Sequence, residues 1–333
     1  MEIVEFDPFT AAEKDLREIF DVASAAHAVD LPDLPPVTFE AVIGGLRTPQ
    51  PNLAPARRWF ARRDGRIVAL ASLFLPPAEN SALSLVKLLV HPDVRRHGVG
   101  TAVFHRISPA LRDEGRTVVE AWNVRKGSPG ERFGSALGFR VVCSTLFQVL
   151  SLDGLGPVPD VPPAKGYRLR SWSRSAPDDL VDSYASARQA IADSPFGQSA
   201  FRFPDWNARR VRADEEDRRR TNIEQRIVAA VHEESGVVAG FTELNLPAHH
   251  QDVAFQGDTA VLAEHRGHGL GYCLKTSMLR WLRAEHPGHQ QVYTSTASAN
   301  AHMAGINHRL GFRDFQETLV LAQDVAFCDT SRA

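Results

Sequence analysis

Two short segments of the chain combine arginine with closely spaced glycines. The first reads Arg95-Arg96-His97-Gly98-Val99-Gly100 and is followed by Thr101, and the second reads Arg266-Gly267-His268-Gly269-Leu270-Gly271. Glycines let backbone approach a ligand closely, and the start of a helix offers unpaired N–H groups and the positive end of its dipole. The arginines add positive charge beside these groups. The pattern therefore predicts two phosphate-binding loops.

Apolar runs on either side of these loops predict the elements that position them. In the first half we expect strands over residues 66–75, 84–90 and 117–121, and a helix over 99–111. In the second half the same order predicts strands over 236–246, 254–262 and 291–294, and a helix over 270–283. Strands that precede helices and then alternate with them indicate a mixed α/β sheet in each half.

A second pair of motifs shows that the chain is duplicated. Leu137-Gly138-Phe139-Arg140 recurs as Leu310-Gly311-Phe312-Arg313, about as far from the glycine loop in one half as in the other. Between the halves, residues 154–165 are rich in proline and glycine, which favours an extended linker. We expect an N-terminal domain over residues 1–153, this linker, and a C-terminal domain over 166–333.

Composition excludes several classes of partner. The 333 residues are 43% hydrophobic and 23% charged with a formal net charge of -2, which argues against a nucleic-acid partner or an anionic membrane surface. Three scattered cysteines, no basic segment leading into an apolar run and no membrane-length helix predict a cytoplasmic protein. His265 and His268 have a possible ligand spacing but no nearby cysteine, so we predict no metal. Composition makes no prediction about oligomeric state.

The motif order resembles the GNAT superfamily of N-acetyltransferases, whose pyrophosphate loop reads Gln/Arg-x-x-Gly-x-Gly/Ala. Both loops match this pattern, and Asn300 through Phe312 match the family's later signature of Asn, a helix and Leu-Gly-Phe. The tandem layout is similar to that of mycothiol synthase and of related actinobacterial proteins. The resemblance implies two tandem GNAT folds of the α/β class, with acetyl-CoA as co-substrate.

The resemblance also implies where acetyl-CoA binds. It would lie where two central strands splay apart, with its pyrophosphate on the glycine loop. Its pantetheine would pair with the preceding strand, at Leu89 and Val90 in the first copy and at Val261 and Leu262 in the second. A backbone N–H near Leu262 would polarise the thioester carbonyl. Asn300 and Asn307 are further expected contacts.

Two carboxylates of the second copy are candidates for the base that deprotonates the incoming amine. Glu243 and Asp258 fall on adjacent predicted strands, and Glu243 is preferred because an exposed polar residue is unexpected at mid-strand. The family often uses a tyrosine as the acid for the leaving thiolate. Gly134 and Asn307 stand at those positions, so the resemblance supplies no acid.

The second copy is expected to be the catalytic one. The first copy has no acid on its strand 84–90, so it is expected to bind acetyl-CoA with little or no turnover, or to brace its partner. The predicted reaction moves an acetyl group directly, in a ternary complex, to the primary amine of a small molecule. A non-catalytic acyl-CoA-binding or interaction protein and a mycothiol-synthase-like enzyme are the alternatives. The early helices, about residues 12–46 and 176–220, are expected to shape the substrate pockets.

Overall fold

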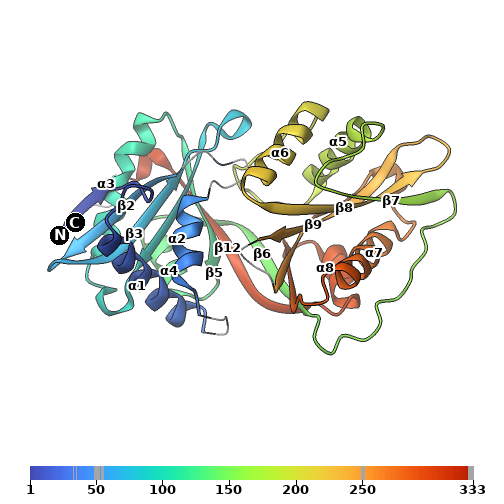
Figure 1. The fold of residues 1–333 in the computed structure, drawn as a ribbon. Coiled ribbons are helices and arrows are strands. Elements are labelled where there is room, and N and C mark those ends of the chain that lie inside the picture. The colour runs from blue at the N-terminus through green and yellow to red at the C-terminus, as the bar shows by residue number, and fades with distance from the viewer. Residues whose placement is uncertain (33, 35, 49–52, 54–55, 249–251, 329–333) are drawn as a thin grey trace. The chain divides into compact units, whose positions relative to one another are not determined.

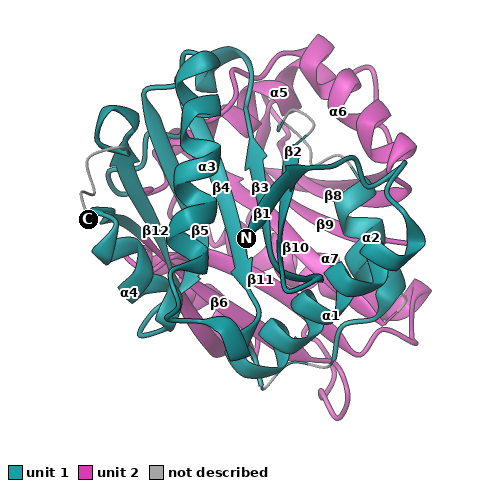
Figure 2. Cartoon of the chain, turned by 90° about the vertical axis from the view of Figure 1, so that its left-hand side faces the viewer, with its two compact units in different colours: residues 1–143, 197–201, 318–333 teal, residues 144–196, 202–317 magenta. Residues whose placement is uncertain are grey.

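The computed structural model in Figure 1 describes residues 1–32, 34, 36–48, 53, 56–248 and 252–328. The chain divides into two compact units, coloured separately in Figure 2. Unit 1 comprises residues 1–143, 197–201 and 318–333, and unit 2 comprises residues 144–196 and 202–317. Each unit therefore contains chain from both halves of the sequence. The predicted domain boundary at residues 154–165 divides the duplicated sequence and stays a prediction. The compact units do not follow it, because each unit includes residues from before and after this segment.

Unit 1 contains a mixed sheet in the order β1-β2-β3-β4-β5-β12. β4 and β5 are parallel, and the other neighbours are antiparallel. Its strands are β1 (Glu2–Glu5), β2 (Arg57–Arg63), β3 (Arg66–Phe74), β4 (Leu83–Val90), β5 (Val118–Arg125) and the part of β12 (Arg313–Asp324) from Thr318 onward. Its helices are α1 (Glu13–Asp30), α2 (Phe39–Arg47), α3 (Val99–Asp113) and α4 (Pro129–Ala136).

Helices cover both faces of the unit 1 sheet. On one face α1 and α2 bury Ile19 and Ile43 against Leu70 of β3. On the other face α3 buries Val103 and Ile107 in a cluster that includes Leu321 of β12. Side chains alternate between the faces along a strand, so β2, β3 and β4 contribute to both clusters.

Unit 2 repeats this architecture with the order β6-β11-β10-β9-β8-β7. Its strands are β6 (Arg140–Ser151, within the unit from Ser144), β7 (Tyr167–Ser173), β8 (Ile223–His232), β9 (Val238–Pro247), β10 (Val253–Val261) and β11 (Gln291–Ala297). Its helices are α5 (Val181–Gln189), α6 (Ala208–Arg220), α7 (Leu270–Glu285) and α8 (Ala301–Arg309). α5 and α6 cover the face that carries Phe241, and α7 covers the face that carries Leu244.

The proline-rich segment packs against unit 2. Residues 152–166 form neither helix nor strand. The thiol of Cys273 on α7 donates to the Val161 carbonyl at 3.1 Å, and Arg283 donates to the Gly156 carbonyl at 2.7 Å. Leu155 and Val158 lie against the cluster that α7 buries. The segment thus has no regular secondary structure, and contacts with α7 hold it at Gly156 and Val161.

The predicted α/β fold is confirmed, and each predicted strand and helix matches an observed element to within a few residues. β1, β2, β6, β7, β8 and β12 had no prediction. Residues 33 and 35 of the expected early helical segment lie outside the described residues. Among the described helices, none has a run long and apolar enough to cross a membrane.

Candidate active site

The central strands of both units separate at the point where the resemblance places acetyl-CoA. In unit 2 the parallel pairing of β10 with β11 ends at Phe255 and Tyr293, after three residue pairs. In unit 1 the parallel pairing of β4 with β5 likewise ends after three pairs, at Leu85 and Glu120. Beyond these pairs each strand carries backbone N–H and C=O groups that form no hydrogen bonds with its parallel neighbour. Such groups can bind an extended ligand.

The backbone of β10 corrects one expected contact. The Leu262 N–H donates to the Ala239 carbonyl at 2.9 Å, so it is not available to a thioester carbonyl. Backbone groups of alternate strand residues point to opposite sides, so the N–H groups of Thr259 and Val261 point away from β9. These two are the donors that β10 offers toward the split.

The glycine loops have the backbone that the phosphate prediction requires. Gly98 and Gly269 adopt left-handed φ values of 75° and 69° at the start of α3 and α7. An added Cβ at either glycine would meet no protein atom within 4 Å, so the space beside each is open. The first N–H groups of a long helix point into this space, an arrangement that suits a pyrophosphate. The loops therefore fit the phosphate part of acetyl-CoA.

The last glycine of each motif serves helix packing instead. A Cβ on Gly100 would lie 3.1 Å from the Phe133 ring of α4, and one on Gly271 would lie 3.3 Å from Ile306 of α8. These contacts let the loop helix approach its neighbour closely. The two glycines thus set the helix position without facing the open space.

The motif arginines are held by protein groups. Arg95 forms a bidentate pair with Asp30 at 2.7 and 2.8 Å and donates from Nε to the Val90 carbonyl at 3.0 Å. Arg266 repeats the pattern, with Asp193 at 2.5 Å and the Val261 carbonyl at 3.0 Å. The sequence suggested that both arginines add charge for the phosphate. In the structure an acid balances each charge, and each arginine braces the end of the strand before the loop.

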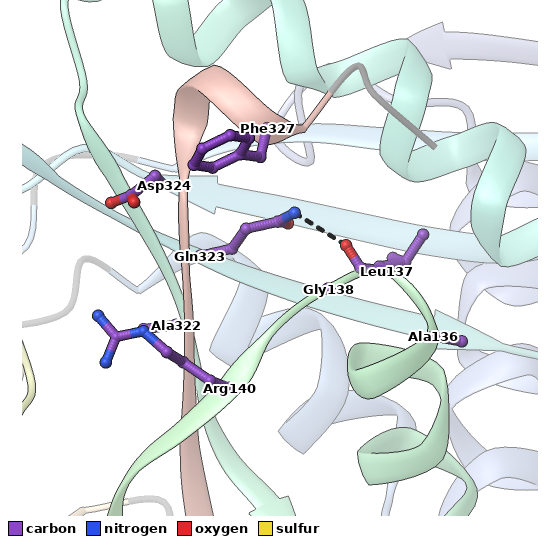
Figure 3. A pocket seen from close by; sticks show the side chains of 8 residues that line it. All are labelled: Ala136, Leu137, Gly138, Arg140, Ala322, Gln323, Asp324 and Phe327. Atoms are coloured by element: carbon purple, nitrogen blue, oxygen red, sulfur yellow. Dashed lines mark hydrogen bonds between the residues drawn. The ribbon is translucent and has the colours of Figure 1, made fainter. Parts of the chain in front are cut away.

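Two grooves that bear comparison with the expected cofactor site lie among the described residues of unit 1. One, of about 540 Å³, adjoins the glycine loop and is lined by Met1, Glu2, Arg62, Arg63, Asp64, Gly65, His97, Gly98, Val99 and Ala102. Figure 3 shows the other, of about 470 Å³, at the end of α4, where Gln323 donates to the Leu137 carbonyl at 2.8 Å. The second groove includes no residue of the glycine loop, so only the first bears on acetyl-CoA.

Glu243 of β9 lies in a buried polar network in unit 2. The sequence predicted an unusual exposed polar residue at mid-strand, but only 2% of the Glu243 surface reaches solvent. It accepts hydrogen bonds from the Tyr184 hydroxyl at 2.8 Å and from the Gln225 amide at 3.2 Å. Arg188 Nε lies 3.4 Å from it, and Arg188 also pairs with Asp214 at 3.1 Å. Burial and the charge of Glu243 raise the Tyr184 pKa well above its usual range.

Asp258 of β10 has a different environment. The strand bulges here, because its register against β9 shifts between Gln256 and Thr259. Water reaches the Asp258 side chain, yet surrounding protein removes much of its hydration. This desolvation, together with the nearby charge of Glu243, raises the Asp258 pKa to about 6. An accessible carboxylate that ionises near neutral pH is suited to proton transfer.

The equivalent positions of unit 1 carry other residues. Lys87 lies eight residues before Arg95, as Asp258 lies eight residues before Arg266. Ser72 of β3 pairs with Lys87, and β3 and β4 pair without a register shift. At these positions of unit 1, β4 pairs with β3 without a bulge, and Ser72 and Lys87 stand in place of the two carboxylates. Strand 84–90 thus carries no acid, as expected.

Asn300 and Asn307 have structural partners. The Asn300 side chain caps α8 by accepting from the Met303 N–H at 3.1 Å. Asn307 is fully buried, where it accepts from Lys275 Nζ at 2.8 Å and donates to Gln148 at 2.7 Å. Asn307 is therefore closed to solvent, and the structure gives no support to the predicted contact with acetyl-CoA. Burial lowers the pKa of Lys275 to about 7.

Lys275→Met is expected to flatten the pH dependence of stability between pH 7 and 10.5, the folded and ordinary pKa values of this lysine. In that window the unfolded chain binds a proton that the folded chain has released. The wild-type free energy of unfolding should therefore rise with pH, by at most about 1.4 kcal/mol per unit. Urea unfolding of both proteins across the window measures this slope. The exposed Lys14→Met is the control, and equal slopes in wild type and Lys275→Met would contradict a buried, neutral lysine.

The tyrosine that the family often uses is absent at both expected positions. A Cβ on Gly134 would lie 2.5 Å from the end of the buried Leu321 side chain, so a larger residue there would have to displace it, and Asn307 is buried. Within the described ranges no three His, Cys, Asp or Glu side chains are grouped as metal ligands. Tyr184 and Arg188 were not among the predicted site residues. Their position on a helix that faces Glu243 depends on tertiary packing.

Comparisons with known proteins identify the family to which the chain belongs. The model of the Acetyltransferase (GNAT) family matches residues 20–139 and again residues 190–312. Mycothiol acetyltransferase of Mycolicibacterium smegmatis is 25% identical over 261 residues, which cover 78% of this chain and 81% of that protein. The mycothiol acetyltransferase of Sanguibacter keddieii is 31% identical over 198 residues, 58% of each protein.

Two solved structures share the whole architecture. A tandem GNAT protein from the clavulanic acid biosynthesis pathway has a TM-score of 0.77 and 26% identity, and the match covers 97% of this chain and 98% of that one. A GCN5-related N-acetyltransferase from Sphaerobacter thermophilus has a TM-score of 0.74 and 18% identity, and the match covers 97% and 95%. With two copies of the family's domain, the chain belongs to the GNAT family of acetyltransferases, as a member of the tandem type.

Proposed function

We propose that unit 2 moves an acetyl group from acetyl-CoA directly to the primary amine of a small molecule, in a ternary complex. The observation that carries this proposal is Asp258, a solvent-accessible carboxylate with a pKa of about 6, on the strand that splits from β11. An amine attacks only when it is neutral, so a base beside the split is the group that this reaction needs. Unit 1 has Lys87 at the equivalent position, which supports unit 2 as the catalytic unit.

The residues that would hold acetyl-CoA in unit 2 lie in one continuous stretch. The loop around Gly269 offers N–H groups to its pyrophosphate, and Thr259 and Val261 offer N–H groups along the split. Acetyl-CoA supplies the activated acetyl group. Asp258 would take the proton from the amine, and Glu243 would keep the pKa of Asp258 raised through its charge. In this scheme Arg266 positions β10 against the loop.

Two substrate classes remain as separate candidates. The similarity to relatives named mycothiol acetyltransferase favours the small-molecule acceptor of those enzymes. One such relative is similar over 78% of this chain. A structural neighbour from clavulanic acid biosynthesis favours a small amine of an antibiotic pathway. Both are small-molecule amines. A non-catalytic acyl-CoA-binding protein is the rival from another class.

A panel of acceptors tests the proposal by thiol release from acetyl-CoA. The panel contains the acceptor of the mycothiol acetyltransferases, amino sugars, aminoglycosides and a peptide with a free N-terminus and lysine. We expect saturable turnover with a small amine. Double-reciprocal plots of rate against one substrate, at several fixed concentrations of the other, should give intersecting lines, as a ternary complex requires. Acetyl-CoA binding with no turnover of any acceptor would favour the rival, and turnover of the peptide alone would overturn the small-molecule class.

A further inference from the structure

Lys87 presents an amine at the place where unit 2 presents its base. It precedes the motif arginine by the same eight residues as Asp258 does. Leu89, two residues further along β4, packs in the cluster of α1 and α2, and alternate residues of a strand share a face. Lys87 therefore lies on the face opposite α3, as Asp258 lies on the face opposite α7.

The position along β4 brings Lys87 to the strand split. The last parallel pair is Leu85 with Glu120, and Lys87 follows two residues later, where β4 has left β5. The glycine loop with Gly98 follows at the end of the same strand, beside the groove of about 540 Å³. A ligand whose pyrophosphate lies at Gly98 and whose chain runs back along β4 would reach Lys87.

Among the residues that the structure describes, none is a partner of the Lys87 ammonium. Water reaches its side chain, and no described residue forms a hydrogen bond or ion pair with it. The surrounding protein removes hydration, and this desolvation lowers the Lys87 pKa. A larger fraction of its amine is then neutral and nucleophilic than for a lysine in open water.

The buried acid of the same face cannot serve an external amine. Glu120 of β5 is 0% exposed, and it accepts from the Ser199 hydroxyl at 2.9 and 3.0 Å and from the Ala200 N–H at 2.7 Å. The Trp122 indole donates a further bond at 2.7 Å. Residues 197–201 thus cover this carboxylate within unit 1. An amine entering from solution would find no free base there, whereas Lys87 is already in place.

We infer that Lys87 is itself the acetyl acceptor of unit 1, so that this unit acetylates its own chain. The Lys87 nitrogen forms a bond to the carbonyl carbon of acetyl-CoA while the carbon–sulfur bond breaks. The sulfur leaves as the thiolate of coenzyme A and takes up the proton that the nitrogen loses. The product is a stable amide, so the step occurs once per chain. The inference rests on the proposed binding of acetyl-CoA at the Gly98 loop.

Mass spectrometry of peptides from protein incubated with deuterium-labelled acetyl-CoA tests the inference. The chain has only five lysines, Lys14, Lys87, Lys126, Lys165 and Lys275, so every site can be followed. We expect Lys87 to be labelled at least roughly tenfold faster than exposed Lys14 and Lys165, because a bound reagent acts at a high effective concentration. Lys87→Arg should bind acetyl-CoA with unchanged affinity and lose only this label.

Three further arms separate a local reaction from general reactivity. Excess coenzyme A should suppress labelling of Lys87 in the wild type, which needs no variant to fold. Gly98→Glu should abolish it, whereas Gly115→Glu, which adds the same charge at another open glycine with positive φ in unit 1, should not. Acetic anhydride needs no binding site. It should label Lys87 in the wild type, Gly98→Glu and Gly115→Glu, which reports whether the amine stays accessible.

The outcomes distinguish the inference from the proposed cofactor site. Calorimetry on Gly269→Glu measures acetyl-CoA binding to unit 1 alone. Binding there without preferential labelling of Lys87 would overturn the inference and leave the cofactor site standing. Absence of binding would overturn both. Labelling of Lys87 that persists in Gly98→Glu or under excess coenzyme A would show ordinary lysine reactivity and would also overturn the inference.

Discussion

Gly269→Glu is expected to abolish turnover by removing acetyl-CoA from unit 2. Gly269 has a φ of 69° and open space beside it, so a glutamate there projects a negative charge into the proposed phosphate site. Two hydrogen bonds from backbone to a charged group, at about 1.5–3 kcal/mol each, correspond to an affinity loss of roughly a hundredfold or more. Calorimetry measures the affinity, and thiol release measures the turnover.

Two matched changes make this result specific. Gly154→Glu places the same side chain at another unit 2 glycine with positive φ and open surroundings, and should leave acetyl-CoA binding intact. Gly98→Glu is the equivalent change in unit 1 and should leave most turnover in place. If Gly98→Glu removed turnover while Gly269→Glu kept it, unit 1 would be the catalytic unit. Unchanged affinity in both variants would refute the loop assignment.

Asp258→Asn is expected to lower kcat/KM by about 10²- to 10⁴-fold at neutral pH, the usual contribution of a general base. The wild-type kcat/KM should fall as the pH drops below about 6, because the carboxylate is then protonated. The asparagine variant lacks this ionisable carboxylate, so its low kcat/KM should not show the fall that Asp258 causes below about pH 6. The loss should shrink at high pH, where more of the substrate amine is neutral without help. A pH series of initial rates measures both effects.

Glu243→Gln separates the two carboxylates. Glu243 raises the pKa of Asp258 through its charge, so the variant should shift the acid limb of the rate profile to lower pH while most activity at neutral pH remains. The variant also removes one of the negative charges that balance the buried Arg188. Breaking a buried ion pair lowers the free energy of unfolding by roughly 3–5 kcal/mol at most. A large, pH-sensitive loss in Glu243→Gln beside a nearly silent Asp258→Asn would assign the base to Glu243.

The fold was predictable because it depends on local patterns. The glycine loops follow a strand and begin a helix, and both features are visible as apolar periodicity beside Gly98 and Gly269. The strands without a prediction have weaker patterns. β8 and β12, for example, mix polar residues such as Gln225 and Gln323 into buried positions, where their amides bond inside the unit.

The chemistry of the site was only partly predictable. Sequence placed Glu243 and Asp258 on adjacent strands, but their order of importance depends on what faces them. Tyr184 and Arg188 approach Glu243 from a helix 55 or more residues away in sequence, and a bulge turns Asp258 toward water. Side chains brought together by packing leave no mark in the local sequence, so burial could not be inferred there.

Unit 1 is complete only after its strand β12, which is synthesised late, has been made. Unit 1 takes Thr318–Asp324 as the neighbour of β5, yet the ribosome makes these residues after all of unit 2. Until they emerge, β5 presents an unpaired edge with apolar residues such as Val119, and such edges promote aggregation. The nascent first unit therefore stays open while unit 2 is made, and a gene fragment that stops after the first repeat encodes a sheet that lacks this strand.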